Sequence, residues 1–323
     1  MSRKQSGAAF ELVFAAALWG FGFIAMVWAL RSMGPLAITG WRFVIAAAVS
    51  ALIVLMKPSL WRDVNWQQFR LAAVPGILLC ITLIFQTWGL KYTTATKSGL
   101  ITTLYVLIVP IFDVIFLKRK QSRFHYFYVF VSLIGVSLIC DFPALFNGHS
   151  DPASLSRSSS QNWNIGDLLT FICACAASVQ IFWFALISKK IGSAFVFNGF
   201  QSIWAGVIPL VLSFFLEPAP SMSLFTSPSS LPLIGLLSLA LGSTVIGFGL
   251  QVRAQKILSP SLASLLYLLE SPFATVFAIY FLGESLAASQ WFGAGLVLMA
   301  ATLSTAFNTE ASEPPSPSPL SSS

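Results

Sequence analysis

Residues Leu265–Glu284, LLYLLESPFATVFAIYFLGE, form an apolar stretch of membrane-spanning length that also carries a carboxylate and a helix breaker. Glu270 is near the middle of this stretch, and an ionised side chain at the centre of a bilayer costs roughly 3 kcal/mol on insertion scales and more on others. Pro272 lacks a backbone donor and bends a helix, which a membrane protein tolerates where neighbours or water satisfy the freed carbonyl. Together the two residues predict a polar cavity beside this helix.

The composition places the whole chain among membrane proteins. Of its 323 residues, 56% are hydrophobic and 9% are charged, whereas soluble domains carry about 25% charged residues. The formal charge of +7 comes from short basic clusters at the ends of apolar segments, a distribution that indicates membrane topology and not a nucleic-acid partner. We therefore expect a multi-pass protein whose surroundings are the lipid bilayer.

A span needs about 20 apolar residues, and the chain offers ten such segments: Ala8–Leu30, Leu36–Met56, Leu71–Leu90, Ser98–Leu117, Phe124–Phe142, Asp167–Ile187, Ala194–Leu216, Leu231–Leu250, Leu262–Leu282 and Leu286–Phe307. With a cytoplasmic N-terminus, 13 of the 18 Lys and Arg residues fall on the cytoplasmic side, which places both termini there. The sequence predicts an all-α membrane protein of ten transmembrane helices.

Two polar stretches divide these spans. Residues 143–166 are Ser-rich and are interpreted as an external linker between residues 1–142 and 167–307, which hold five spans each. Residues 308–323, rich in Ser and Pro, are predicted to be a disordered tail. The organisation expected is therefore two halves of equal span number.

The halves show internal similarity. A shift of 162 residues superimposes 98–117 on 260–279 with six identities, among them Tyr105 with Tyr267 and Pro110 with Pro272. Because each half has an odd number of spans, the two would enter the membrane from opposite sides as inverted repeats, the usual plan of alternating-access transporters. Proline-interrupted helices at matching positions point to the binding site, so Pro110 and Pro272 are predicted helix breaks beside it.

Three of the charged residues within predicted spans are candidates for a functional role. Glu270 is interpreted as a proton-coupling carboxylate or as a counter-ion for a substrate ammonium, with a hydrogen-bonded tie between helices as the structural alternative. Asp113 lies one turn before the basic cluster at 118–120, where an ion pair at the helix end is the simpler interpretation. For Arg42, two turns into the second segment, the sequence leaves open an extended side chain reaching the interface and an interior position at an anionic group.

Aromatic and amide side chains form a second set of candidates. Each alone is more often an interhelical contact than a ligand, but together they would give the cavity an amphipathic lining suited to small zwitterionic or amphipathic metabolites. They are Trp19, Gln86, Tyr105, Gln180, Trp183, Gln251 and Tyr267.

Other functional classes lack their residues. The two histidines, His125 and His149, fall at a membrane edge and in the linker, and Cys173 and Cys175 have no second cysteine pair or nearby histidine to complete a metal site. No phosphate-binding loop and no nucleophile paired with a base is found. We expect neither a metal nor a cofactor, and no enzymatic activity.

The chain resembles the EamA type of the drug/metabolite transporter superfamily, which has ten spans in two EamA repeats. The resemblance rests on ALWGFGFI from Ala17, on Trp41-Arg42-Phe43, on residues 86–110 and on LESPFATVFAIYFLGE from Leu269. It implies an inner- or plasma-membrane carrier, commonly an exporter of amino acids or other small metabolites. It also implies a central cavity lined by helices one, three, four, six, eight and nine, which here draws on Trp19, Gln86, Tyr105, Gln180, Trp183, Tyr267 and Glu270.

The leading hypothesis is a secondary transporter in which two five-helix repeats rock around a midplane cavity, with Glu270 as the candidate for proton coupling. The alternative is a structural or sensory membrane protein on the same bundle that moves no solute. The sequence leaves the substrate, the direction of transport, the coupling ion and the oligomeric state open.

Overall fold

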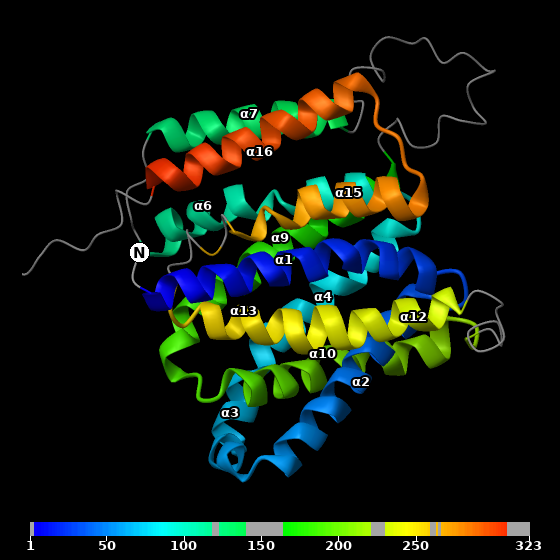
Figure 1. Ribbon diagram of the computed structural model, residues 1–323, viewed down its shortest axis with the longest axis vertical. Helices are drawn as coiled ribbons and strands as arrows, with labels where there is room; N and C mark the ends of the chain where they lie inside the picture. The colour runs from blue at the N-terminus through cyan, green and yellow to red at the C-terminus, as the bar shows by residue number, and fades with distance from the viewer. Residues whose placement is uncertain are drawn as a thin grey trace, which may run out of the picture.

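The computed structural model describes residues 3–117, 123–139, 164–220, 230–258, 263 and 266–308, and its regular elements in these ranges are helices (Figure 1). The first half holds α1 (Arg3–Ala29), α2 (Pro35–Met56), η1 (Pro58–Asp63), α3 (Trp66–Leu71), α4 (Ala73–Leu90), α5 (Ala95–Thr102), α6 (Tyr105–Leu117) and α7 (Arg123–Ile139). The second half holds α9 (Ile165–Ile187), η3 (Ser188–Lys190), α10 (Ala194–Leu216), α12 (Leu231–Leu237), η4 (Ser238–Phe248), α13 (Gly249–Ala254), α15 (Glu270–Leu282) and α16 (Ala288–Asn308). The predicted tail after residue 308 and the predicted linker as far as residue 163 lie outside the described residues.

Six of the described helical stretches are long and apolar enough to cross a membrane: Lys4–Ala29, Pro35–Met56, Trp66–Leu90, Ile165–Phe184, Ala194–Leu216 and Leu231–Ala254. Their outer faces carry large apolar side chains, such as Phe214 and Phe215 on α10, which are 71% and 81% exposed. Apolar surface of this extent is unfavourable in water and matches lipid tails. The chain is a multi-pass membrane protein.

Of the other four predicted spans, the fourth and the ninth are interrupted. The segment predicted as one helix at Ser98–Leu117 is two helices, because turns at Thr103 and Leu104 separate α5 from α6. In the segment predicted at Leu262–Leu282, a turn at Leu268 and Leu269 precedes α15. The helices α7 and α16 occupy the fifth and tenth positions, and the end predicted for the fifth span, Phe142, lies outside the described residues.

Local sequence signals set several helix ends. Pro35 is the first residue of α2, where its missing N–H is not needed. The start of α9 is a capping box in which Asn164 accepts from the Asp167 amide and Asp167 accepts from the Asn164 amide, both at 3.1 Å. Helix α9 therefore begins within the last residues assigned to the linker. Gly283 ends α15 with φ of 66°, a left-handed conformation that glycine adopts without strain.

The main helix pairs join the two halves. Helix α2 packs along α10, α4 along α9 and α1 along α15, while α7 pairs with α16 at one edge of the bundle (Figure 1). Close approach is possible because small residues lie at the crossings: a Cβ added to Gly40 of α2 would lie 2.6 Å from the Cα of Leu210 on α10. The centre of the bundle is thus built from both halves of the chain.

At the end of the bundle where α1, α4 and α10 finish, carboxylates bind helix N-termini across the halves. Glu217, which follows α10, accepts from the backbone amides of Leu36 and Ala37 at 2.8 Å each. Glu284, which follows α15, accepts from the amides of Ala95 and Thr96 at 2.8 and 3.1 Å. Each carboxylate satisfies two donors that a helix cannot satisfy itself.

Buried and exposed ion pairs add further links. Lys97 and Asp167 form a pair with nitrogen and oxygen 3.7 Å apart and side chains 1% and 0% exposed, close to the N-termini of α5 and α9. At the opposite end, Arg253 of α13 makes a two-pronged pair with Glu11 of α1. Both ends of the bundle therefore carry polar bonds between the first and the second half.

We expect Gly40→Ala to lower the melting temperature of the purified protein in detergent. The added methyl would meet the backbone of Leu210, and overpacking of this kind costs about 1–3 kcal/mol. Gly7→Ala is the matched control, because a Cβ at Gly7 meets no atom within 4 Å. Equal melting temperatures for Gly40→Ala and the native chain would contradict the close α2–α10 contact.

Candidate functional site

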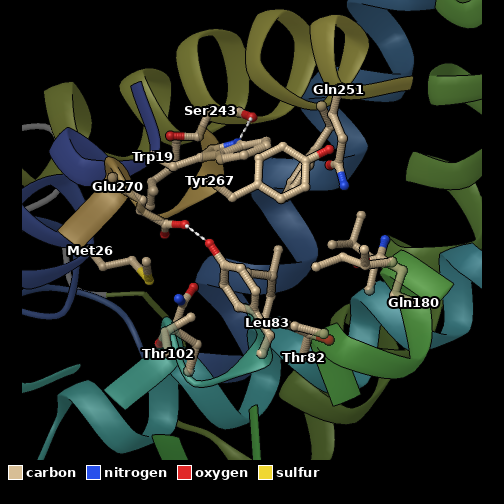
Figure 2. Close-up of a pocket in the computed structure, with 18 of the residues that line it drawn as sticks. Trp19, Met26, Thr82, Leu83, Thr102, Gln180, Ser243, Gln251, Tyr267 and Glu270 are labelled. Atoms are coloured by element: carbon tan, nitrogen blue, oxygen red, sulfur yellow. Dashed lines mark hydrogen bonds between the residues drawn. The ribbon is translucent and has the colours of Figure 1, made fainter. Parts of the chain in front are cut away.

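A pocket with an empty volume of about 600 Å³ lies within the bundle, between α1, α2, α4, α9, the end of α5, η4 and the starts of α6 and α15. Side chains from both halves line it (Figure 2). The lining consists of Trp19, Gly22, Met26, Arg42, Leu79, Thr82, Leu83, Gln86, Thr102, Tyr105, Ala177, Gln180, Ile181, Leu239, Ser243, Phe248, Gln251, Tyr267 and Glu270. It combines one cation, one carboxylate, three amides and several aromatic rings.

The two helix interruptions bring Tyr105 and Glu270 together. These residues are the first of α6 and α15, and the Tyr105 hydroxyl donates to Oε2 of Glu270 at 3.5 Å, the dashed line from Glu270 in Figure 2. Both side chains are buried, at 4% and 8% exposed. A carboxylate in the first turn of a helix is favoured by the helix dipole, so the interruption before α15 helps to hold Glu270 inside the bundle.

Pro272 explains part of this geometry. As the third residue of α15 it has no N–H for the carbonyl of Leu268, and that carbonyl instead accepts from the Ser271 amide at 3.2 Å. The backbone group freed by the proline is thus satisfied within the chain, as a membrane interior requires. Pro110 lies inside α6, and the interruption of its segment comes seven residues earlier, at Thr103.

Aromatic rings make one wall of the pocket. Trp19 of α1 lies 5.3 Å from Phe248 and 5.4 Å from Tyr267 between ring centroids, and Tyr267 lies 6.3 Å from Tyr105. The Trp19 indole N–H donates to the carbonyl of Ser243 at 3.1 Å (Figure 2). The Tyr267 hydroxyl is buried and interacts with the side chain of Gln251. Both side chains line the pocket.

The amides contribute polar groups on the other side. Gln86, Gln180 and Gln251 are 5%, 3% and 4% exposed, and Nε2 of Gln180 lies 3.5 Å from the carbonyl of Pro75. Arg42, whose position the sequence left open, lines the pocket and is 2% exposed. The pocket thus offers both donors and acceptors to a solute.

The segment η4 is a π-helix, and it borders the pocket along its length. Side chains of three other helices hold it: Trp19 at the Ser243 carbonyl, Arg42 at the Thr244 hydroxyl, and Asn198 of α10 at the Thr244 carbonyl. π-Helical turns are rare and frequently found at functional sites. The sequence of this stretch predicts an ordinary α-helical span, Leu231–Leu250.

Six of the seven candidate lining residues lie around the pocket, and Trp183 does not. Trp183 packs one turn beyond Gln180 against a cluster of Ala72, Phe184, Ile187, Ile191, Phe197 and Val252, where α3, α10 and α13 close over α9. The side chain of Asp113 lies outside the described residues, so its predicted ion pair stays a prediction. Gln180 lies in the lining of the pocket.

Sequence reasoning missed several smaller lining residues. Met26 follows Trp19 by seven positions, and Thr82 precedes Gln86 by four. Since residues three, four and seven apart share one helix face, extending that spacing from each polar candidate would have found them. Phe248 precedes the candidate Gln251 by three positions, whereas Ser243, in the π-helix, lies at none of these spacings from a candidate.

The fold is that of a multi-pass helical membrane protein with a pocket inside the bundle. The model of the EamA-like transporter family matches residues 7–140 and again residues 164–306. The chain belongs to this family, and the sequence-based assignment to the drug/metabolite transporter superfamily is confirmed.

Two relatives agree with this assignment, and one solved structure has a similar fold. A protein of Archaeoglobus fulgidus named as an uncharacterized transporter is 28% identical over 301 residues, which are 92% of this chain and 85% of that protein. One of Clostridium kluyveri with the same name is 27% identical over 272 residues, 80% of this chain and 82% of that protein. A solved crystal structure that is 16% identical has a TM-score of 0.62 and covers 94% of this chain and 98% of that chain, a likeness of fold alone.

We expect Trp19→Phe to increase hydrogen exchange across Ser238–Phe248, measured by mass spectrometry in detergent. The substitution removes the indole donor to the Ser243 carbonyl, and lost hydrogen bonds lower the free energy of local opening, here by about 1 kcal/mol or more. Trp66→Phe, at a side chain 68% exposed, should leave this segment unchanged. Unchanged exchange in Trp19→Phe would show that the indole does not hold η4.

Proposed function

We propose that this protein is a secondary transporter of small amino-acid-like or amphipathic solutes, that it works by alternating access, and that it exports them. The observation that carries the proposal is a pocket inside the bundle that side chains of both halves line. Movement of one half against the other would open such a pocket first to one side of the membrane and then to the other, while the pocket itself stays in place. The transport involves no enzymatic step, cofactor or metal, and the protein resides in the inner or plasma membrane.

The pattern of helix neighbours supports two inverted five-span repeats. In such repeats, each span of the first half corresponds to the span five places later in the second half. The contact of α1 with α15 then corresponds to the contact of α9 with α5 and α6, and the contact of α4 with α9 corresponds to that of α1 with α12 and η4; all of these are present. The pairs α2–α10 and α7–α16 each join two corresponding spans. A two-fold relation between the halves accounts for all of these neighbours at once.

Proton coupling through Glu270 is supported by its surroundings. The carboxylate is buried at the pocket, and the Tyr105 hydroxyl is its hydrogen-bond partner among the described residues. Burial favours the neutral, protonated form of a carboxyl group, and a cationic group of the solute or a tyrosine donor favours the charged form. Solute binding can therefore exchange with a proton at the same side chain.

Counterflow into proteoliposomes tests the transport proposal. With a mixed pool of labelled amino acids and small metabolites, the native chain should exchange at least one solute saturably and with a dependence on pH. Glu270→Gln should flatten the pH dependence, because the side chain no longer titrates, and Asp63→Asn, at the pair with Arg62, should not. Absence of any flux from folded native protein would contradict the transport proposal and favour the structural or sensory alternative.

The proposed topology has its own test. A protease site inserted within residues 143–166 should be cut in intact cells, because these residues connect two halves on the outer side. Tags at the N-terminus and after residue 308 should react with antibody only after the cells are permeabilised. An accessible N-terminal tag in intact cells would overturn the cytoplasmic placement that follows from the 13 of 18 basic residues counted on that side.

A further inference from the structure

Arg42 is a buried cation whose bonding is incomplete. Its Nε donates to the Thr244 hydroxyl at 3.1 Å, and its guanidinium carbon lies 5.5 Å from the centre of the Phe43 ring. Within the part of the chain that the structure describes, these two contacts are its polar and cation–π partners, and the terminal nitrogens have no acceptor. An unpaired charge costs several kcal/mol in such an interior, so the guanidinium needs a partner from elsewhere.

The carboxylates with described side chains are committed to other groups. Five of them bind a cation or helix amides, and the sixth, Glu270, accepts from Tyr105. The five are Glu11 with Arg253, Asp63 with Arg62, Asp167 with Lys97, Glu217 at the start of α2 and Glu284 at the start of α5. Among these side chains, therefore, Arg42 has no ion pair.

We infer that Arg42 is the anchor for a carboxylate of the solute that occupies the pocket. The guanidinium presents parallel N–H donors in a fork that matches the two oxygens of a carboxylate, and Arg42 already lines the pocket. Glu270 borders the same pocket and opposes additional negative charge, so one carboxylate suits it better than a doubly charged phosphate. This inference rests on the proposed function, because it assigns the chemistry of the solute.

A purely structural role for Arg42 has a different signature. In that case its hydrogen bond to Thr244 would tie α2 to η4, and the guanidinium would have no part in solute binding. Thr244→Val removes the hydroxyl and keeps the guanidinium, whereas Arg42→Gln removes the charge. A tie predicts similar effects of the two substitutions on solute binding, and an anchor predicts a loss confined to Arg42→Gln.

The experiment measures solute-induced thermal stabilisation of the purified protein in detergent. One probe is a mixture of L-amino acids and small monocarboxylic acids; the other is the matched mixture in which every carboxylate is a primary amide. The acids should stabilise the native protein and Thr244→Val, and the amides should not. Arg42→Gln should weaken the apparent affinity at least about 30-fold, as expected for removal of one partner of a buried charge pair. Arg42→Lys should fall between, and exposed Arg70→Gln should match the native chain.

Several results would overturn the inference. These are equal stabilisation by acids and amides, stabilisation by neither, stabilisation by inorganic phosphate or chloride in place of the acids, and full stabilisation of a folded Arg42→Gln. If Arg42→Gln does not fold, the native protein and Arg42→Lys decide between the same outcomes. Counterflow separates the two proposals: flux of solutes without a carboxylate keeps the transporter and removes the anchor, whereas binding of acids without any flux keeps the anchor and removes the transporter.

Discussion

Carboxylates at helix N-termini are the interaction on which this bundle depends. The first turn of a helix presents backbone donors without partners, and lipid offers none. Glu217 accepts hydrogen bonds from the first amides of α2, Glu284 accepts from those of α5, and Asp167 takes part in the cap of α9. Glu270 lies in the first turn of α15. Four of the six carboxylates with described side chains therefore lie at helix N-termini.

The charged side chains differ in how completely they are bonded. A carboxylate that binds two amides, such as Glu284, is fully occupied, and so is Asp167 with Lys97. Among the described residues, Glu270 has one long bond, to Tyr105, and Arg42 has one bond, to Thr244. Both of these side chains face the same pocket. The incomplete bonding of opposite charges in one cavity distinguishes that cavity from the rest of the interior.

Sequence reasoning succeeded where the outcome depends on residues that are neighbours in the sequence. Apolar length gave the bounds of Ala194–Leu216 as the structure has them, and a carboxylate beside a proline in an apolar stretch pointed to the pocket. It failed where the outcome depends on a distant partner. Nothing near Glu217 or Glu284 in the sequence shows that they bind α2 and α5, about half the chain away, and nothing near Trp183 shows that α3 and α13 cover it. The π-helix at Ser238–Phe248 was missed for the same reason, because side chains of α1, α2 and α10 hold it.

The separation between these caps and their helices bears on how the protein is made. Glu217 follows the residues it binds by 180 and 181 positions, and Glu284 follows its own by 188 and 189. During translation, α2 and α5 are synthesised long before either carboxylate leaves the ribosome. Until then, the amides at the starts of α2 and α5 must form hydrogen bonds with water or lipid headgroups at the membrane interface. The first half reaches its final arrangement only when the second half has been inserted beside it.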